Sequence, residues 1–272
     1  MGTPKASLEW HGSTLLRRTT AVVDRVVSGP VVVVAAPDQE LPALPPGVDV
    51  VEDPVEGRGP MQGIATGLAA VADRAGEAFV CSTDLPFLHP AFVAAVLRAI
   101  CTPAEEQEPE IEVAMPVARG FRQPLAAAYR TRLAGFIQQR VAEGDFRPGM
   151  LFKHVRVVEL DDPALLADPQ LGRLDPELDS VVNVNDPVSY AAARRRPAPE
   201  VVVERFGALA SGGHRGPRRM RAATLGAAAS GAELALDRHV LAALNGDQIT
   251  RDPEIPLVAG DVVAFLTADG GG

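Results

Sequence analysis

The sequence predicts an α/β protein with a mainly parallel sheet, followed by a small α+β domain. Short apolar runs typical of buried parallel strands alternate with helical patterns up to about Arg194. The chain has 272 residues, of which 47% are hydrophobic, so it can bury a sizeable core. The segment 194–199 is charged and contains two prolines, which is typical of a linker.

The elements of the first domain, 1–194, follow from the spacing of apolar residues. Strands are predicted at 31–36, 48–52, 78–82, 112–117, 125–129, 155–160 and 180–184. Helices are predicted at 14–27, 61–74, 90–100 and 131–143. Because strands and helices alternate, right-handed crossovers are expected to build a Rossmann-like α/β sandwich.

A second domain, 201–272, is expected after the linker 195–200. Its predicted elements are strands at 201–206, 219–223, 240–244 and 262–268 and an alanine-rich helix that begins near residue 224. Asn245-Gly246 predicts a tight turn after one of these strands. The chain ends in Gly270-Gly271-Gly272, a tail that suits a narrow active-site channel or, as the alternative, a frayed terminus.

The composition limits which kinds of binding partner and which cellular compartment are expected. The formal net charge is −9 and the one basic block is Arg194-Arg195-Arg196, which argues against a nucleic-acid partner. Cys81 and Cys101 lack metal-ligand spacing, and a reduced cytoplasmic compartment is the simpler interpretation. The longest apolar run, 31–36, is far too short to span a bilayer, and no signal peptide is recognisable.

One polar cluster directly follows the predicted strand 78–82. Ligands of open α/β sheets bind beyond the carboxyl ends of the strands. A carboxylate at Asp84 would hold Mg²⁺ against a triphosphate, because Mg²⁺ prefers a few carboxylates together with phosphate oxygens. The alternative is that Asp84 caps the turn that follows it.

A second cluster is a loop rich in glycine and proline. Its candidate residues are Asp53, Glu56, Gly59, Pro60 and Gly63. Glycines let the backbone approach a flat base closely. A carboxylate, from either Asp53 or Glu56, would accept hydrogen bonds from guanine N1–H and N2–H. An ordinary loop is the alternative.

A third cluster surrounds two asparagines. Asn183 and Asn185 are two residues apart, so on a strand both would point to one side, towards a phosphate or the ligands of a metal. The alternative is an Asx turn in which Asp186 is a helix N-cap and Pro187 the first helical residue.

These clusters together resemble molybdenum cofactor guanylyltransferases, over roughly residues 1–194. The matching residues are Met1, Gly2 and Lys5, Gly59-Pro60-Met61-Gln62-Gly63, Thr83-Asp84-Leu85-Pro86 and Asn183-Val184-Asn185-Asp186-Pro187. Gln123-Pro124 departs from the family, which often has His-Pro there. Such enzymes open with a strand and a glycine-rich turn, so we expect the true start of the protein upstream of Met1.

The resemblance implies a nucleotidyl transfer from GTP to Mo-molybdopterin with release of pyrophosphate. It implies that Lys5 binds phosphate, that Asp84 binds Mg²⁺ and that these two residues are catalytic. It also implies that the Asp53–Gly59 loop reads guanine and that Asn183 and Asn185 face the pterin phosphate or the metal. A cytidylyltransferase, or a degenerate transferase domain that acts as a scaffold, is the alternative.

The C-terminal residues 200–272 resemble β-grasp sulfur carriers, namely the small subunit of molybdopterin synthase and the thiamine sulfur carrier. The residues that carry the resemblance are 205–209, 243–247, 259–263 and the terminal glycines. The resemblance implies that Gly271 and Gly272 form a carrier tail and that an adenylating or sulfur-transfer enzyme is the partner.

Overall fold

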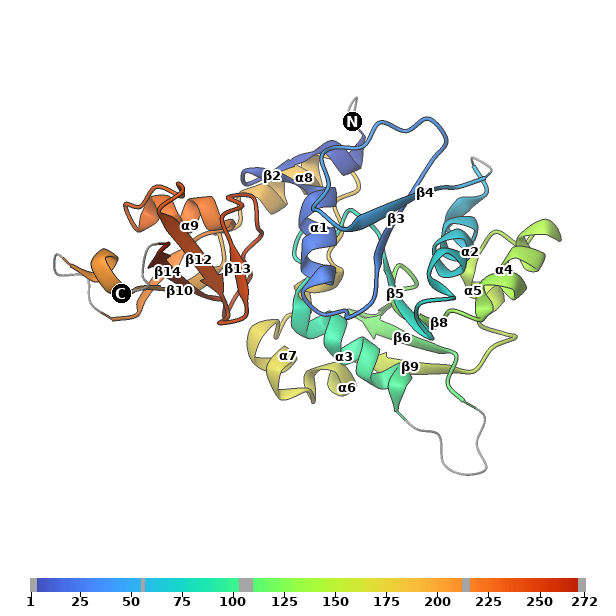
Figure 1. The fold of residues 1–272 in the computed structure, drawn as a ribbon. Helices are drawn as coiled ribbons and strands as arrows, with labels where there is room; N and C mark the ends of the chain where they lie inside the picture. Colours follow the sequence, from blue (N-terminus) through green and yellow to red (C-terminus); the bar gives the residue numbers. More distant parts are fainter. Residues whose placement is uncertain (1–3, 55–56, 103–109, 212–215, 269–272) are drawn as a thin grey trace. The chain divides into compact units, whose positions relative to one another are not determined.

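A computed structural model describes residues 4–54, 57–102, 110–211 and 216–268 (Figure 1). The chain divides into two compact units. Unit 1 consists of Met1–Ser7 and Leu15–Val184, and unit 2 of Leu8–Thr14 and Asn185–Gly272, within the described residues. None of the helices in the described ranges is long and apolar enough to cross a membrane.

Unit 1 is a mixed α/β structure. Its strands are β3 (Val31–Ala35), β4 (Val48–Glu52), β5 (Glu77–Cys81), β6 (Val113–Ala118), β7 (Phe121–Arg122), β8 (Ala126–Arg130) and β9 (Val157–Asp161). Its helices are α1 (Leu15–Asp24), α2 (Gly59–Val71), α3 (Pro90–Cys101), α4 (Leu133–Ala142), α5 (Pro148–Leu151), α6 (Asp162–Leu166) and α7 (Pro169–Leu174), with 3₁₀ turns η1 (Lys5–Ser7) and η2 (Asp179–Val181). The prediction of alternating strands and helices is confirmed.

The prediction of a mainly parallel sheet is wrong. β3 pairs with β4 in parallel and β6 pairs with β9 in parallel, but β8 runs antiparallel to both β5 and β6. The reason is the connection between β6 and β8, which is a hairpin through β7 with Arg119 (φ 54°) and Gly120 (φ 81°) at its turn. A parallel pairing needs a crossover of roughly a dozen residues or more, and the segment between β6 and β8 is too short for one.

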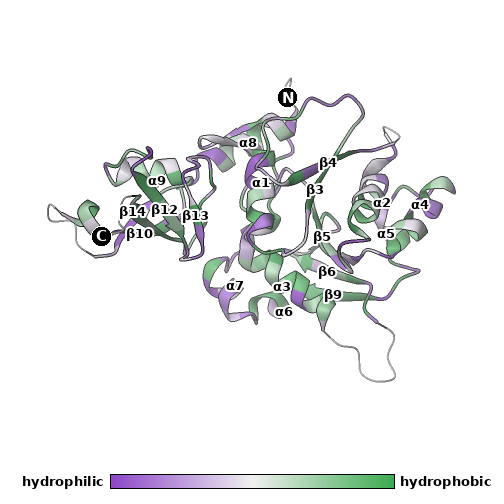
Figure 2. Cartoon of the chain, viewed as in Figure 1, coloured by the Kyte–Doolittle hydropathy of each residue, from purple (hydrophilic) through white to green (hydrophobic). Residues whose placement is uncertain are grey.

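The residues of β5 alternate between two helical layers. Ala78 and Val80 pack against the core of α2 and α4, whose fully buried members include Ile64 and Ile137. Phe79 points to the other side, where its ring lies 6.5 Å from that of Phe92 in α3, in an edge-to-face arrangement. Figure 2 shows the central strands and α3 largely in the hydrophobic colour, as expected for a sheet that is covered on both faces.

The prediction of a strand at 180–184 is also wrong. Residues 179–181 form η2, and the rest of the segment is not paired with any described strand. The carboxylate of Asp175 accepts the backbone N–H groups of Asp179 (2.7 Å) and Ser180 (3.0 Å), and Leu178 has a positive φ of 51°. A side chain thus provides the hydrogen bonds that a neighbouring strand would otherwise provide.

Unit 2 combines an N-terminal hairpin with the C-terminal part of the chain. The hairpin consists of β1 (Glu9–Trp10) and β2 (Ser13–Thr14), and it groups with α8 (Pro187–Arg194) through the rings of Trp10 and Tyr190, 6.1 Å apart. The predicted first domain would include α8, whereas the structure groups α8 with unit 2. The domain division at residues 195–200 stays a prediction.

A five-stranded sheet forms the rest of unit 2, with the order β11-β10-β14-β12-β13. The elements are β10 (Glu200–Arg205), η3 (Gly207–Ala210), β11 (Arg218–Arg221), α9 (Leu225–Gly231), β12 (Val240–Leu244), β13 (Gln248–Thr250) and β14 (Val262–Thr267). β10 and β14 are parallel neighbours, and the core of this unit includes Leu225 and Phe265. The predicted turn is confirmed, because Asn245 and Gly246 both have positive φ between β12 and β13.

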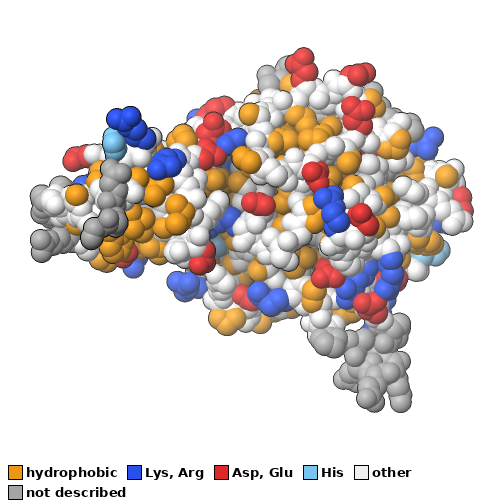
Figure 3. All heavy atoms as spheres, in the orientation of Figure 1, with side chains coloured by type: hydrophobic (Ala, Val, Ile, Leu, Met, Phe, Trp, Pro, Cys, Tyr) orange, Lys and Arg blue, Asp and Glu red, His pale blue; other side chains and the backbone are white. Residues whose placement is uncertain are grey.

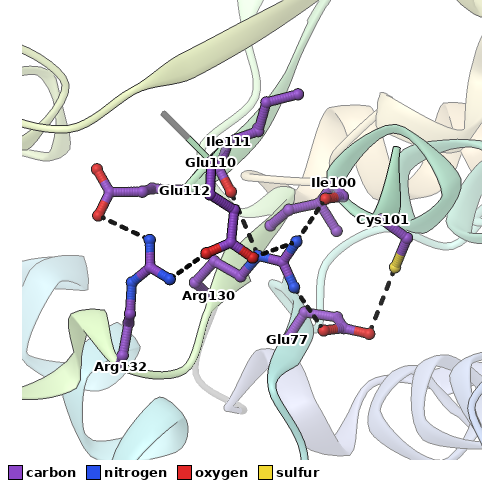
Figure 4. Close-up of polar contacts among 8 residues, drawn as sticks. All are labelled: Glu77, Ile100, Cys101, Glu110, Ile111, Glu112, Arg130 and Arg132. Atoms are coloured by element: carbon purple, nitrogen blue, oxygen red, sulfur yellow. Dashed lines mark hydrogen bonds and ion pairs between the residues drawn. The ribbon is translucent and has the colours of Figure 1, made fainter. Parts of the chain in front are cut away.

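An ion-pair cluster joins β5, β8 and the end of α3 in unit 1. Figure 4 shows the guanidinium of Arg130 between Glu77, Glu110 and the carbonyl of Ile100, at 2.9, 3.0 and 2.8 Å. The side chain of Arg130 is 15% exposed, so this cation is largely removed from water but has acceptors on several sides.

We expect Arg130→Met to lower the free energy of unfolding by about 3 kcal/mol, because it leaves a partly buried carboxylate and a helix-end carbonyl without their cation. Denaturant titration followed by circular dichroism measures the change. The matched control is Arg132→Met, which removes a cation that pairs with Glu110 but is 53% exposed. An equal loss in the two variants would contradict the role given to Arg130, because an exposed ion pair stabilises by about 1 kcal/mol or less.

Candidate functional site

The candidate site is built around the loop that connects β5 with α3. The strand ends at Cys81, and Asp84 follows three residues later with only 8% of its surface exposed. Its carboxylate accepts hydrogen bonds from Lys5 Nζ at 2.8 Å and from Ser82 Oγ at 2.5 Å. The structure therefore brings together two predicted site residues that are 79 positions apart in the sequence.

The backbone of this loop is also fixed to distant segments. The N–H of Val184 donates to the carbonyl of Asp84 at 3.0 Å, and the N–H of Ser82 donates to the carbonyl of Leu125 at 3.0 Å. The bond from Val184 places the segment that carries Asn183 beside the Asp84 loop. A carboxylate, an ammonium group and an asparagine-bearing segment thus converge at one end of β5.

The asparagines are exposed on either side of buried Val184. Val184 is fully buried, whereas Asn183 and Asn185 are exposed, so the alternation expected of an extended segment is present although the segment is not a strand. Asp186 accepts the N–H groups of Val188 and Ser189, and Pro187 starts α8. The capping alternative is therefore confirmed for Asp186 and Pro187, while the roles of Asn183 and Asn185 stay predictions.

The predicted base-reading loop lies between β4 and α2. The N–H of Asp53 donates to the carbonyl of Ala35 at 2.7 Å, which fixes Asp53 beside the end of β3. Its Oδ2 lies 4.0 Å from the position of a Cβ on Gly63, so the carboxylate lies beside the fifth residue of α2, near the N-terminus of that helix. A helix N-terminus stabilises a nearby carboxylate. Gly59 (φ 70°) and Pro60 begin α2, and Glu56 lies outside the described residues.

Gln123, which departs from the family pattern, closes the β6–β7 hairpin. Its N–H donates to the carbonyl of Pro116 at 2.9 Å, and its Nε2 donates to the carbonyls of Ala118 (3.4 Å) and Phe121 (3.3 Å). All of these bonds are local to the hairpin. The side chain thus has a structural role that sequence reasoning did not assign.

The carboxylate of Asp84 fits a magnesium site of the kind that is completed by substrate phosphates. The described residues contain no group of three or more His, Cys, Asp or Glu side chains able to hold a metal ion by themselves. Mg²⁺ is commonly bound by one or two carboxylates together with phosphate oxygens and water, so a single carboxylate suffices. Asp84 already accepts a cationic partner in Lys5, which shows that its environment suits a positive charge.

The neighbouring thiol is not a candidate nucleophile. Burial, with a smaller contribution from the negative charge of Asp84, raises the pKa of Cys81 to about 12. A thiol with such a pKa stays protonated near neutral pH, and the thiolate is the reactive form. Cys81 is therefore expected to be a structural thiol.

Several residues that fix the loop were missed by sequence reasoning. Arg18, His89, Asp175 and Ser180 are all buried polar residues around the Asp84 loop. None belongs to a motif, and Arg18, His89 and Ser180 make contacts that join segments far apart in the chain. On the molecular face drawn in Figure 3, acidic and basic side chains are interspersed.

Two curated relatives of this chain are described as probable molybdenum cofactor guanylyltransferases. A probable molybdenum cofactor guanylyltransferase of Mycobacterium bovis (strain BCG / Pasteur 1173P2) is 37% identical over 153 residues, which are 53% of this chain and 69% of that protein. A protein of the same description from Mycobacterium avium (strain 104) is 33% identical over 147 residues, 53% of this chain and 70% of that protein.

A solved structure and a family model agree with these relatives. Molybdopterin-guanine dinucleotide biosynthesis protein A from Archaeoglobus fulgidus has a TM-score of 0.52 and 19% identity, covers 71% of this chain and 90% of its own, and thus shows a shared fold. The model described as MobA-like NTP transferase domain matches residues 1–157. This match spans more than half of the 272 residues, and the chain therefore belongs to the MobA-like NTP transferase family, a family of nucleotidyltransferases.

Proposed function

We propose that the chain acts as a molybdenum cofactor guanylyltransferase, which transfers GMP from GTP to Mo-molybdopterin. The observation that carries this proposal is the pair formed by Lys5 and Asp84 beyond the end of β5, 2.8 Å apart. A carboxylate can bind Mg²⁺ and an ammonium group can bind phosphate oxygens, so this pair offers both of the contacts that a metal-bound triphosphate would use. The relatives described as guanylyltransferases support the choice of base and acceptor.

In the proposed reaction, a terminal phosphate oxygen of molybdopterin bonds to the α-phosphorus of GTP. The bond from that phosphorus to the bridging oxygen breaks, and pyrophosphate leaves with the electron pair. Mg²⁺, once bound by Asp84, would neutralise charge on the phosphates. Lys5 would leave Asp84 for the phosphate oxygens, and Asn183 and Asn185 would orient the acceptor phosphate.

We assign the reading of the base to the loop that contains Asp53. Its backbone N–H is bonded to the carbonyl at the end of β3, and its carboxylate lies beside Gly63 of α2, which has no side chain to displace it. Guanine N1–H and N2–H together match a carboxylate, and cytosine presents no equivalent pair. Glu56 is the other candidate of the same loop.

A titration with GTP and with CTP in the presence of Mg²⁺ tests the base. GTP is expected to bind about tenfold or more tightly than CTP, since one well-placed pair of hydrogen bonds to a base discriminates by about 1–3 kcal/mol. Asp53→Asn should reduce this preference, and Asp49→Asn, an exposed carboxylate on β4, is the control. Equal affinities for the two nucleotides in the wild-type protein would contradict a guanylyltransferase. Pyrophosphate release from GTP with Mo-molybdopterin then tests the acceptor.

We further propose that the sheet of unit 2 is a β-grasp domain with a sulfur-carrier role. The order β11-β10-β14-β12-β13, with parallel neighbours β10 and β14 and a helix between β11 and β12, supports the β-grasp assignment. Gly271 and Gly272 lie outside the described residues. Deleting both should abolish thiocarboxylate formation by an adenylating and sulfur-transfer system, as measured by intact mass. A thiocarboxylate on the shortened chain would contradict the carrier role.

A further inference from the structure

A chain of buried hydrogen bonds holds the last residue of the Asp84 loop. The N–H of His89 donates to Ser180 Oγ at 3.1 Å, across 91 positions of sequence. The hydroxyl of Ser180 in turn bonds to the carboxylate of Asp175, which also accepts the N–H of Ser180 at 3.0 Å. Ser180 is 0% exposed and Asp175 is 7% exposed, so water does not replace these contacts.

A second anchor holds the middle of the same loop. Arg18, on α1, donates from Nε to the carbonyl of Pro86 at 2.6 Å. Arg18 is 6% exposed, which is unusual for an arginine on a helix that carries no site motif. Three hydrogen bonds thus fix the loop: the bond from Val184 at Asp84, the bond from Arg18 at Pro86, and the bond to Ser180 at His89.

These anchors are costly to bury, which argues that they do more than fill space. A buried carboxylate is stable only when hydrogen bonds compensate for lost hydration. Burial raises the pKa of Asp175, against the opposing effect of the Ser180 hydroxyl and of the backbone N–H groups of Ser180 and Asp179. An apolar residue would fill the same space without this cost, but it would not accept a hydrogen bond from the loop.

We infer that Ser180, Asp175 and Arg18 are positioning residues, which hold the backbone of residues 84–89 so that the Asp84 carboxylate faces Lys5. Asp175 acts through Ser180, and Ser180 acts through the N–H of His89. The segment that carries Ser180 continues directly into Asn183 and Val184, so the same anchor also holds Asn183 beside the Asp84 loop. The inference relies on the proposed function only for the role of Asp84 as a cation ligand.

The first readout is the affinity of the full chain for the Mn²⁺–GTP complex, measured by the enhancement of water proton relaxation when this complex binds the protein. Ser180→Ala is expected to weaken this affinity about tenfold, and Ser180→Thr, which keeps the hydroxyl, to restore most of it. The matched control is Thr131→Val. Thr131 is 4% exposed and donates from Oγ1 to the carbonyl of Ala75 at 2.7 Å, so this variant also loses one buried hydrogen bond.

Arg18 gives an independent pair of variants in case Ser180→Thr does not fold. Arg18→Met removes the donor to Pro86, whereas Arg18→Lys keeps a donor and a positive charge. The affinity for Mn²⁺ with GTP is expected to fall in Arg18→Met and to recover in part in Arg18→Lys. An unchanged affinity in both Ser180→Ala and Arg18→Met, or an equal loss in Thr131→Val, would overturn the inference.

Hydrogen–deuterium exchange separates this inference from the proposed function. Faster exchange over residues 82–92 is expected in Ser180→Ala and not in Thr131→Val, whether or not the protein binds nucleotide. If the wild-type chain binds no Mn²⁺ with GTP, the proposed function fails and the exchange experiment alone decides. Unchanged exchange over this loop in Ser180→Ala would then overturn the positioning role.

Discussion

Asp84→Asn is expected to lower kcat for nucleotidyl transfer by about 10³-fold, because charge stabilisation of the transferring phosphates is the main contribution at such a site. The amide keeps the size of the side chain, and its oxygen can still accept the hydrogen bond that Ser82 Oγ donates to Asp84 Oδ1 in the wild-type protein, at 2.5 Å. It loses the charge that would hold Mg²⁺. Steady-state pyrophosphate release at saturating GTP measures the effect.

A loss of folding does not explain such a result, and a control makes the distinction. Asp168→Asn changes a carboxylate that caps α7 by accepting the N–H groups of Gln170 and Leu171. This variant should lose some thermal stability and keep its kcat. If Asp84→Asn retained more than about a tenth of the wild-type kcat, Asp84 would not be the metal ligand.

Lys5→Met is expected to have opposite effects on metal and nucleotide. In the absence of nucleotide, a divalent cation must displace the Lys5 ammonium from Asp84, so removal of the ammonium should tighten Mn²⁺ binding. The tightening should be only about threefold, because Lys5 is 37% exposed and a solvent-exposed ion pair contributes about 1 kcal/mol or less. With GTP present the variant lacks a phosphate-binding cation, and kcat/KM should fall about 10²-fold.

The sequence offers a matched control, since Lys153 is its other lysine. Lys153→Met removes the same charge, and neither Mn²⁺ affinity nor kcat/KM should change. Titration calorimetry with Mn²⁺ alone and then with Mn²⁺ and GTP measures both effects. Weaker Mn²⁺ binding to Lys5→Met in the absence of nucleotide would show that the ammonium does not compete for Asp84.

Local signals were sufficient for most elements. The apolar run at 31–36 is β3, the proline-led pattern at 90–100 is α3, and the alanine-rich segment is α9 with Thr224 as its N-cap. Each of these elements depends on neighbours within a few residues, such as a side chain that caps the first turn of a helix. The hairpin β1–β2 was not predicted. Its turn is formed by His11 and Gly12, which both have positive φ.

Two predictions failed because the deciding contacts cannot be seen in the apolar pattern of the segment itself. The sheet is mixed because a short hairpin returns the chain beside β6, and strand direction is not encoded in the apolar pattern of a single strand. The segment 180–184 has the composition of a strand, but the Asp175 carboxylate and the Asp84 carbonyl provide its hydrogen-bond partners. The β-propensity of a segment does not make it a strand where other groups already satisfy its backbone hydrogen bonds.

By itself, the sequence determined where most helices and strands form and which chemical groups follow β5. It identified a carboxylate at residue 84, an ammonium group at residue 5 and a capping Asp186, because motifs and caps are short-range patterns. Only the tertiary structure decided that Lys5 pairs with Asp84 and that Ser180 and Arg18 hold the loop between them. Such hydrogen bonds join segments dozens of residues apart, and geometry rather than local composition selects their partners.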